Sequence, residues 1–209
     1  MSSQISHILS RSLELAATDL SHFQPPKDKE LRKSAILLLF GESVDGLDLT
    51  FIQRSTSLRH HPGQVAFPGG MMDEEDSDEV ATALREAQEE IALQADSIRV
   101  LCTLPNLFVP VSQFEVTPVL AHWHSPHEVF PNDLSEVERV ERIPISELVN
   151  PKNRVNVRHS SGFIGPAFNI RDFVIWGFTG GLLDRLLSVY EFEEEWDQSN
   201  IVDLDSRYS

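Results

Sequence analysis

The stretch GGMMDEEDSDEVATALREAQEEI, residues 69–91, decides the fold of this chain. In its second half an apolar side chain recurs every three or four residues, at Val80, Ala83, Leu84, Ala87 and Ile91. Because an α-helix turns about 100° per residue, these side chains would form one apolar stripe. We therefore predict a helix over residues 77–91 that packs through this stripe on a sheet or on another helix.

A second face of the same helix carries carboxylates. Glu86, Glu89 and Glu90 stand at positions i, i+3 and i+4, so their side chains share one side of the helix. Carboxylates held this close repel each other, and burial strengthens the repulsion. A hard divalent cation such as Mg²⁺ or Mn²⁺ takes carboxylate oxygens as ligands and would relieve it. The alternative is a solvated acidic face on which Arg85 pairs with Glu89.

A glycine pair stands before this helix. Gly69 and Gly70 follow Phe67 and Pro68, and a short acidic loop separates them from the helix. Paired glycines let the backbone approach a ligand closely and expose amides to phosphate. A glycine loop joined to a helix with three carboxylates would be able to clamp a metal-bound pyrophosphate.

The rest of the chain alternates strand-like and helix-like segments. We expect an amphipathic helix over residues 5–20, a linker over 24–30, and loops over 55–72 and 150–166. Strands are predicted at residues 34–40, 48–54, 98–104, 114–121, 137–144 and 173–176, and further helical segments at 145–149 and 182–189. Strands and helices mixed in this order favour an α/β or α+β layered domain.

Three parts follow along the chain. Residues 1–30 are predicted to hold an N-terminal helix and linker, and residues 31–190 the main domain. Residues 191–209 contain EFEEEWD and are predicted to form an acidic, flexible tail.

Composition excludes several classes of protein. The chain has 209 residues with 17 Lys and Arg against 33 Asp and Glu, a formal net charge of −16. That balance argues against nucleic-acid binding, which needs basic residues to neutralise phosphate. No apolar run approaches the ~20 residues that span a bilayer, and the N-terminus lacks a signal-peptide core. With one cysteine, Cys102, the chain fits a reducing compartment, so we expect a soluble cytoplasmic protein without a membrane partner.

The segment REAQEEIAL, residues 85–93, resembles the second half of the Nudix box, Gly-x(5)-Glu-x(7)-Arg-Glu-U-x-Glu-Glu-x-Gly-U, where U is bulky and apolar. The chain departs from that box in three ways: the spacing from Gly70 to Arg85 is one residue longer, the first glutamate falls near Asp76, and Ala92 replaces the last glycine. The chain resembles one subgroup of the Nudix hydrolases, the coenzyme A pyrophosphatase-like enzymes. The resemblance lies in the longer spacing and in two segments, TALREAQEE at 82–90 and RSTSLRHHPGQVAFPGG at 54–70.

This resemblance implies an α/β/α sandwich with a mixed β-sheet and a pyrophosphate-hydrolysing activity. The substrate would be coenzyme A or acyl-CoA, cleaved to 3′,5′-ADP and an (acyl-)4′-phosphopantetheine. Glu86, Glu89 and Glu90 would hold Mg²⁺ or Mn²⁺, and Arg85 would have a structural role, pairing with a carboxylate to join the loop and the helix.

The resemblance does not decide which residue is the general base that accepts a proton from water. Either Glu86 or Glu136 would be the general base, and Glu89 completes the catalytic set. The side chains and backbone expected to bind substrate are those of Arg54, Arg59, Gly69 and Gly70.

Two other functions stay open. One keeps the Nudix fold but takes ADP-ribose or another nucleoside diphosphate derivative as substrate. The other is a nucleotide-binding module with weak catalysis, for which Met71, Met72 and Ala92 speak, because they depart from the pattern of relatives. The oligomeric state is also open, a homodimer included.

Overall fold

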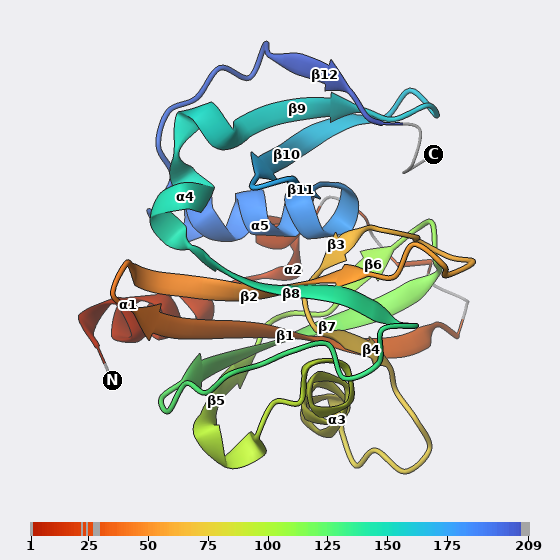
Figure 1. Cartoon of the computed structure of the whole chain (residues 1–209), viewed down its shortest axis with the longest axis vertical. Coiled ribbons are helices and arrows are strands. Elements are labelled where there is room, and N and C mark those ends of the chain that lie inside the picture. Colours follow the sequence, from red (N-terminus) through yellow and green to blue (C-terminus); the bar gives the residue numbers. More distant parts are fainter. Residues whose placement is uncertain (1, 22, 24, 27–29, 206–209) are drawn as a thin grey trace.

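A computed structural model describes residues 2–21, 23, 25–26 and 30–205 (Figure 1). The larger of its two sheets has eight strands: β1 (Arg32–Ser43), β2 (Gly46–Arg54), β3 (Val65–Ala66), β4 (Gly69–Met71), β5 (Ile98–Thr103), β6 (Leu107–Val109), β7 (Phe114–Trp123) and β8 (Val137–Pro144). The main path runs β3-β2-β1-β7-β5, while β4 pairs with β1, β6 with β7 and β8 with β2. Because β1 and β7 run parallel and the other pairs antiparallel, this sheet is mixed.

The long central strands bury both faces of this sheet. In β1, Leu37 and Leu39 belong to one apolar cluster, whereas Leu38 and Phe40 belong to the other. Successive side chains of a strand point to opposite faces, so this alternation provides two cores. Both faces of the sheet must therefore be covered by other elements.

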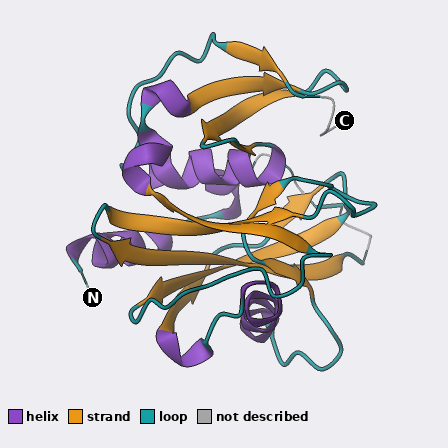
Figure 2. Ribbon diagram, viewed as in Figure 1, coloured by secondary structure: helices purple, strands orange, loops and turns teal. Residues whose placement is uncertain are grey.

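Helices cover the two faces unequally (Figure 2). Helix α3 (Glu79–Ile91) packs on the face that carries Leu37 and Leu39. The other face is covered by α1 (Ser3–Ser12), α2 (Ala17–Leu20), α4 (Ile145–Val149) and α5 (Gly177–Val189). The predicted α/β/α sandwich with a mixed sheet is confirmed.

A second sheet lies beyond α5 (Figure 1). It consists of β9 (Arg154–Arg158), β10 (Ile164–Ile170), β11 (Phe173–Ile175) and β12 (Ile201–Asp203), in the order β11-β10-β9-β12. Two 3₁₀ turns, Ala95–Ser97 and Pro151–Asn153, complete the described elements. The prediction of a loop over residues 150–166 is wrong, since β9 and the start of β10 lie within it.

The C-terminal segment packs on this second sheet. Strand β12 pairs in parallel with β9, although the sequence indicated a flexible tail there. The Trp196 ring lies 4.5 Å from the guanidinium carbon of Arg154, which also lies 4.3 Å from the Phe168 ring. Arg154 is fully buried and forms an ion pair with Asp184 of α5. Residues 206–209 of the predicted tail lie outside the described residues.

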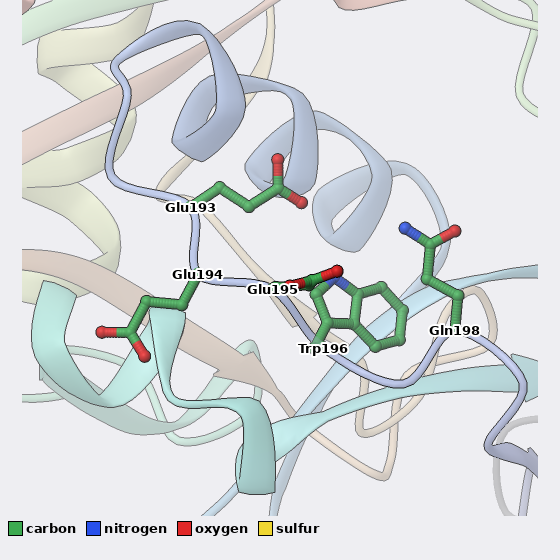
Figure 3. Close-up of a pocket in the computed structure, with 5 residues that line it drawn as sticks. All are labelled: Glu193, Glu194, Glu195, Trp196 and Gln198. Atoms are coloured by element: carbon green, nitrogen blue, oxygen red, sulfur yellow. The ribbon is translucent and has the colours of Figure 1, made fainter.

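The same segment lines a cavity. Figure 3 shows that the cavity lies beside α5, and its volume is about 580 Å³. Its lining residues are Glu193, Glu194, Glu195, Trp196 and Gln198.

The N-terminal segment is split. The predicted helix over residues 5–20 is two helices, because the chain leaves the helical path after Leu13 and re-enters it at Ala17. Arg11 donates to the backbone oxygen of Val189, 3.0 Å away, which ties α1 to the end of α5. Most of the predicted linker over 24–30 lies outside the described residues. None of the described helices is long and apolar enough to cross a membrane.

Candidate active site

Helix α3 presents its carboxylates because its apolar stripe is fixed on the sheet. The side chain of Asp78 caps the helix by accepting a hydrogen bond from the Ala81 amide at 2.8 Å. Ala83, Ala87 and Ile91 are completely buried against the sheet, so the predicted stripe is confirmed. The helix begins at Glu79 rather than at residue 77. This orientation places Glu86 and Glu90 against β4, while Glu89 stays largely exposed.

Glu90 is the most buried of the three glutamates, with 5% of its surface exposed. Its Oε2 accepts a hydrogen bond from the Gly69 amide at 2.9 Å. Burial raises the pKa of Glu90 to about 8, and the negative charges of Glu86 and Glu136 add to this rise. The Gly69 amide and the Arg54 guanidinium act in the opposite direction, but they offset this rise in the pKa of Glu90 only in part. Negative charge at this position is therefore under-compensated.

The glycine pair makes room for this arrangement. Gly69 has φ +146°, and a Cβ there would lie 2.3 Å from the backbone oxygen of Ala35. A Cβ at Gly70 would lie 2.4 Å from the carboxyl carbon of Glu86. The sequence predicted that these glycines would offer their amides to phosphate, but the Gly69 amide is engaged by Glu90. The pair positions Glu90 and Glu86 instead.

Arg85 joins the acidic loop to the helix. It donates two hydrogen bonds to Asp76, at 3.0 and 2.9 Å, and one to the backbone oxygen of Met71 at 3.1 Å. The guanidinium of Arg85 holds the pKa of Asp76 well below its usual range. The same Arg85 donates to Glu86 and to Glu89, each at 3.0 Å. Arg85 thus has the structural role expected from the sequence.

The three glutamates fit a divalent cation in their chemistry, but two of them are engaged. Among the described residues, no three His, Cys, Asp or Glu side chains converge as a ready-made metal site. Arg85 donates to one oxygen of Glu86 and to one oxygen of Glu89. The Glu89 side chain is 58% exposed, so it is free to rotate away from Arg85. Burial raises the pKa of Glu86 as it does that of Glu90, and a cation would offset this cost for both.

Two further predicted residues come to the same place from other elements. Glu136 precedes β8, and its backbone oxygen accepts a hydrogen bond from the Ser55 amide at 2.8 Å. Arg54 ends β2, and its buried Nε has no hydrogen-bond partner among the described residues. The charges of both residues act on Glu90. Arg59, by contrast, is exposed in the loop between β2 and β3, and no described contact joins it to these carboxylates.

Sequence reasoning did not single out two parts of this site. Asp76 anchors Arg85, and the only signal for it was its place near the first glutamate of the Nudix box. Asn132 donates its backbone amide to the Glu90 backbone oxygen at 3.0 Å, and no motif in the sequence marks it.

Comparison with known proteins shows the family to which the chain belongs. The NUDIX domain matches residues 30–161. The Nudix hydrolase NudL of Citrobacter koseri is 35% identical over 169 residues, 74% of this chain and 81% of that protein. The mitochondrial Nudix hydrolase 15 of Arabidopsis thaliana is 30% identical over 189 residues, 85% of this chain and 63% of that protein.

A solved structure shares the fold. The Nudix hydrolase RenU of M. smegmatis is 18% identical with a TM-score of 0.55, and the match covers 80% of this chain and 90% of that one. The chain belongs to the Nudix hydrolase family. It is accordingly a pyrophosphohydrolase, and enzymes of this family generally use divalent cations such as Mg²⁺ or Mn²⁺.

Proposed function

We propose that the chain hydrolyses the pyrophosphate bond of coenzyme A or acyl-CoA, with Mg²⁺ or Mn²⁺ held by Glu86, Glu89 and Glu90. The products are 3′,5′-ADP and (acyl-)4′-phosphopantetheine. The observation that carries the metal assignment is the buried, under-compensated Glu90 carboxylate between Glu86 and the Gly69 amide. When bound, the cation neutralises phosphate charge and lowers the pKa of a bound water.

The protein side chains divide the remaining work. Water adds to one phosphorus, the bridging P–O bond breaks, and the proton of the water passes to a carboxylate. Glu136 is the exposed candidate for this general base, since its charge already acts on Glu90. Glu86 is the second candidate, but Arg85 donates to its Oε1 and a cation would occupy it further. Glu89 serves the catalysis through the metal.

Substrate phosphate is assigned to the arginines. Arg54 has a buried Nε free of hydrogen bonds among the described residues, and its charge acts on Glu90, which suits a phosphate group of the substrate near the carboxylates. Arg59 is exposed in the following loop and suits a phosphate farther from the reaction centre. Gly69 and Gly70 shape the floor of the site. The stretch at residues 54–70 supports coenzyme A over other nucleoside diphosphates.

The proposal also covers the extent of the catalytic unit and the setting of the enzyme. Residues 31–190 are proposed as the catalytic unit, with the flanking segments as additions to it. A net charge of −16 and a single cysteine suit a cytoplasmic enzyme that takes a small nucleotide and no nucleic acid.

A substrate panel tests this function. The full chain is incubated with coenzyme A, acetyl-CoA and ADP-ribose, each with Mg²⁺ or Mn²⁺, and the products are separated by chromatography. We expect 3′,5′-ADP from the two coenzyme A substrates and a higher kcat/KM for them than for ADP-ribose. Faster turnover of ADP-ribose would reject the substrate, and nucleotide binding without metal-dependent turnover would reject the reaction.

A further inference from the structure

The segment between β7 and β8 bridges two sides of the site. On one side, the amides of Phe130 and Asn132 donate to the backbone oxygens of Ile91 and Glu90, at 3.4 and 3.0 Å. On the other side, the Ser55 amide donates to the Glu136 oxygen at 2.8 Å. The segment therefore runs from the carboxyl end of α3 to the end of β2 within a few residues. Its course decides where Glu136 stands relative to Glu90.

Asp133 makes the turn between these two attachments. Its Oδ1 accepts a hydrogen bond from the Ser135 amide at 2.8 Å. Its backbone oxygen accepts from the amides of Glu136 and Val137, at 3.1 and 2.9 Å. Such a side chain mimics a backbone turn and fixes the direction of the residues that follow. The hydrogen bonds from Ser135 also lower the pKa of Asp133, so its carboxylate is an ionised acceptor at neutral pH.

We propose that Asp133 is a positioning residue for catalysis: its hydrogen bond to the Ser135 amide holds the turn that places Glu136 beside Glu90. Asp133 is itself exposed, and no hydrogen bond or ion pair among the described residues joins it to Glu90 or Arg54. Its effect is exerted only through the turn. The inference rests on the proposed function, in which Glu136 accepts a proton from water.

The chain contains a matched control for this turn. Asp197 accepts a hydrogen bond from the Ser199 amide at 2.9 Å, in the same Asp-x-Ser arrangement as Asp133 and Ser135. Asp197 lies in the C-terminal segment, apart from the helix that carries the glutamates. Replacing Asp197 removes the same kind of hydrogen bond without moving Glu136.

The test compares steady-state kinetics on coenzyme A in the full-length protein. Asp133→Ala should lower kcat about tenfold, a fraction of the 10²–10⁴-fold that a positioned base contributes. KM should stay close to that of the native protein, because Arg54 keeps its place on β2. Asp133→Asn keeps an Oδ1 acceptor and should restore most of kcat, while Asp197→Ala should leave kcat unchanged.

A second pair of variants separates positioning from folding. Ser135→Pro removes the amide donor of the same hydrogen bond and should reproduce the loss of Asp133→Ala. If Asp133 acts through Glu136, then Asp133→Ala should cause no further loss in a Glu136→Gln background. Thermal unfolding of each variant shows that the compared proteins are folded.

Three results would overturn the inference. They are a native kcat in both Asp133→Ala and Ser135→Pro, a loss in Asp133→Asn as large as in Asp133→Ala, and an additive loss in the double variant. If these occur while Glu136→Gln is impaired, the base stands and only the role of Asp133 falls. A fully active Glu136→Gln removes the base and the inference together. No turnover of coenzyme A by the native protein rejects the proposed function itself.

Discussion

Gly70 offers a way to displace one carboxylate while the rest of the fold stays intact. A methyl group at Gly70 would lie 2.4 Å from the carboxyl carbon of Glu86 and 2.5 and 2.6 Å from its oxygens. Ordinary contact begins at 3.4 Å, so the carboxylate must retreat by about 1 Å. The clashing atoms are the end of a flexible side chain, so the backbone has no reason to move.

The consequence should appear in activity and leave stability almost unchanged. A displacement of about 1 Å at a reacting centre costs about 10²-fold in rate, so Gly70→Ala should lower kcat/KM by that order. Gly70 has no positive φ, and glycine-to-alanine changes at compatible positions alter stability by about 0.4–1 kcal/mol. The midpoint of urea unfolding should therefore stay near that of the native protein.

Two other glycines serve as controls in the same assay. Gly181→Ala in α5 meets no atom within 4 Å, so it should leave activity unchanged and raise stability by about 0.5–1 kcal/mol, the usual gain of alanine over glycine inside a helix. Gly69 has φ +146°, and a Cβ there would lie 2.3 Å from the Ala35 backbone oxygen, so Gly69→Ala should destabilise the fold. Coenzyme A turnover and urea unfolding are measured on all three variants. Native activity in a folded Gly70→Ala protein would refute the reasoning that the place of the Glu86 carboxylate matters.

Three further results are expected. Glu89→Gln should abolish most metal-dependent turnover with an unchanged circular dichroism spectrum, because it removes charge without volume; normal turnover would make the metal assignment wrong. Trp196→Ala should lower the free energy of unfolding by about 2 kcal/mol, the order of a desolvated cation–π contact with Arg154. No change in urea unfolding would show that the C-terminal segment does not stabilise the second sheet. Without metal, the free energy of unfolding should fall as pH rises from 4.5 towards 8, because Glu90 ionises at about 4.5 when unfolded but at about 8 when folded. Glu90→Gln should flatten this slope relative to the native protein, and equal slopes would contradict the burial of the charge.

The elements with strong periodicity could be predicted from the sequence. The stripe that ends at Ile91 has a period of three to four residues, and α3 lies where that stripe indicated. Strand β1 is longer than the predicted 34–40 at both ends, since Arg32 and Lys33 pair with β7 despite their charge. Burial on both faces makes such central segments almost continuously apolar, which is why they were identified.

Of the second sheet only β11 was predicted, at residues 173–176, because tertiary contacts hold the other strands. The segment over β9 and β10 contains polar residues together with Gly165 and Pro166, which weaken a strand signal. In the structure the Phe163 ring fills the place of a Gly165 side chain, since a Cβ there would lie 2.7 Å from it. Asp184 of α5 pairs with Arg154 of β9. These partners are distant in the sequence, so no local pattern contains them.

The sequence predicted most residues of the candidate site, but it did not predict the hydrogen bonds that join them. Helical spacing places Glu86, Glu89 and Glu90 on one face of α3. Spacing does not reveal that the Gly69 amide would bind Glu90, because that contact depends on the pairing of β4 with β1. The turn at Asp133 is likewise visible only once the segment before β8 is seen against α3.

Calorimetric titration of the full-length protein with Mn²⁺ in the absence of substrate tests the metal site most directly. The protein is compared with Glu86→Gln, Glu89→Gln and Glu90→Gln, and with Glu193→Gln as a control carboxylate in the C-terminal segment. We expect saturable binding by the native protein and by the control, and a clear loss of affinity in each of the three helix variants. Binding that is undetectable in the native protein, or equally tight in all four variants, would contradict a divalent cation held by the carboxylate face of α3.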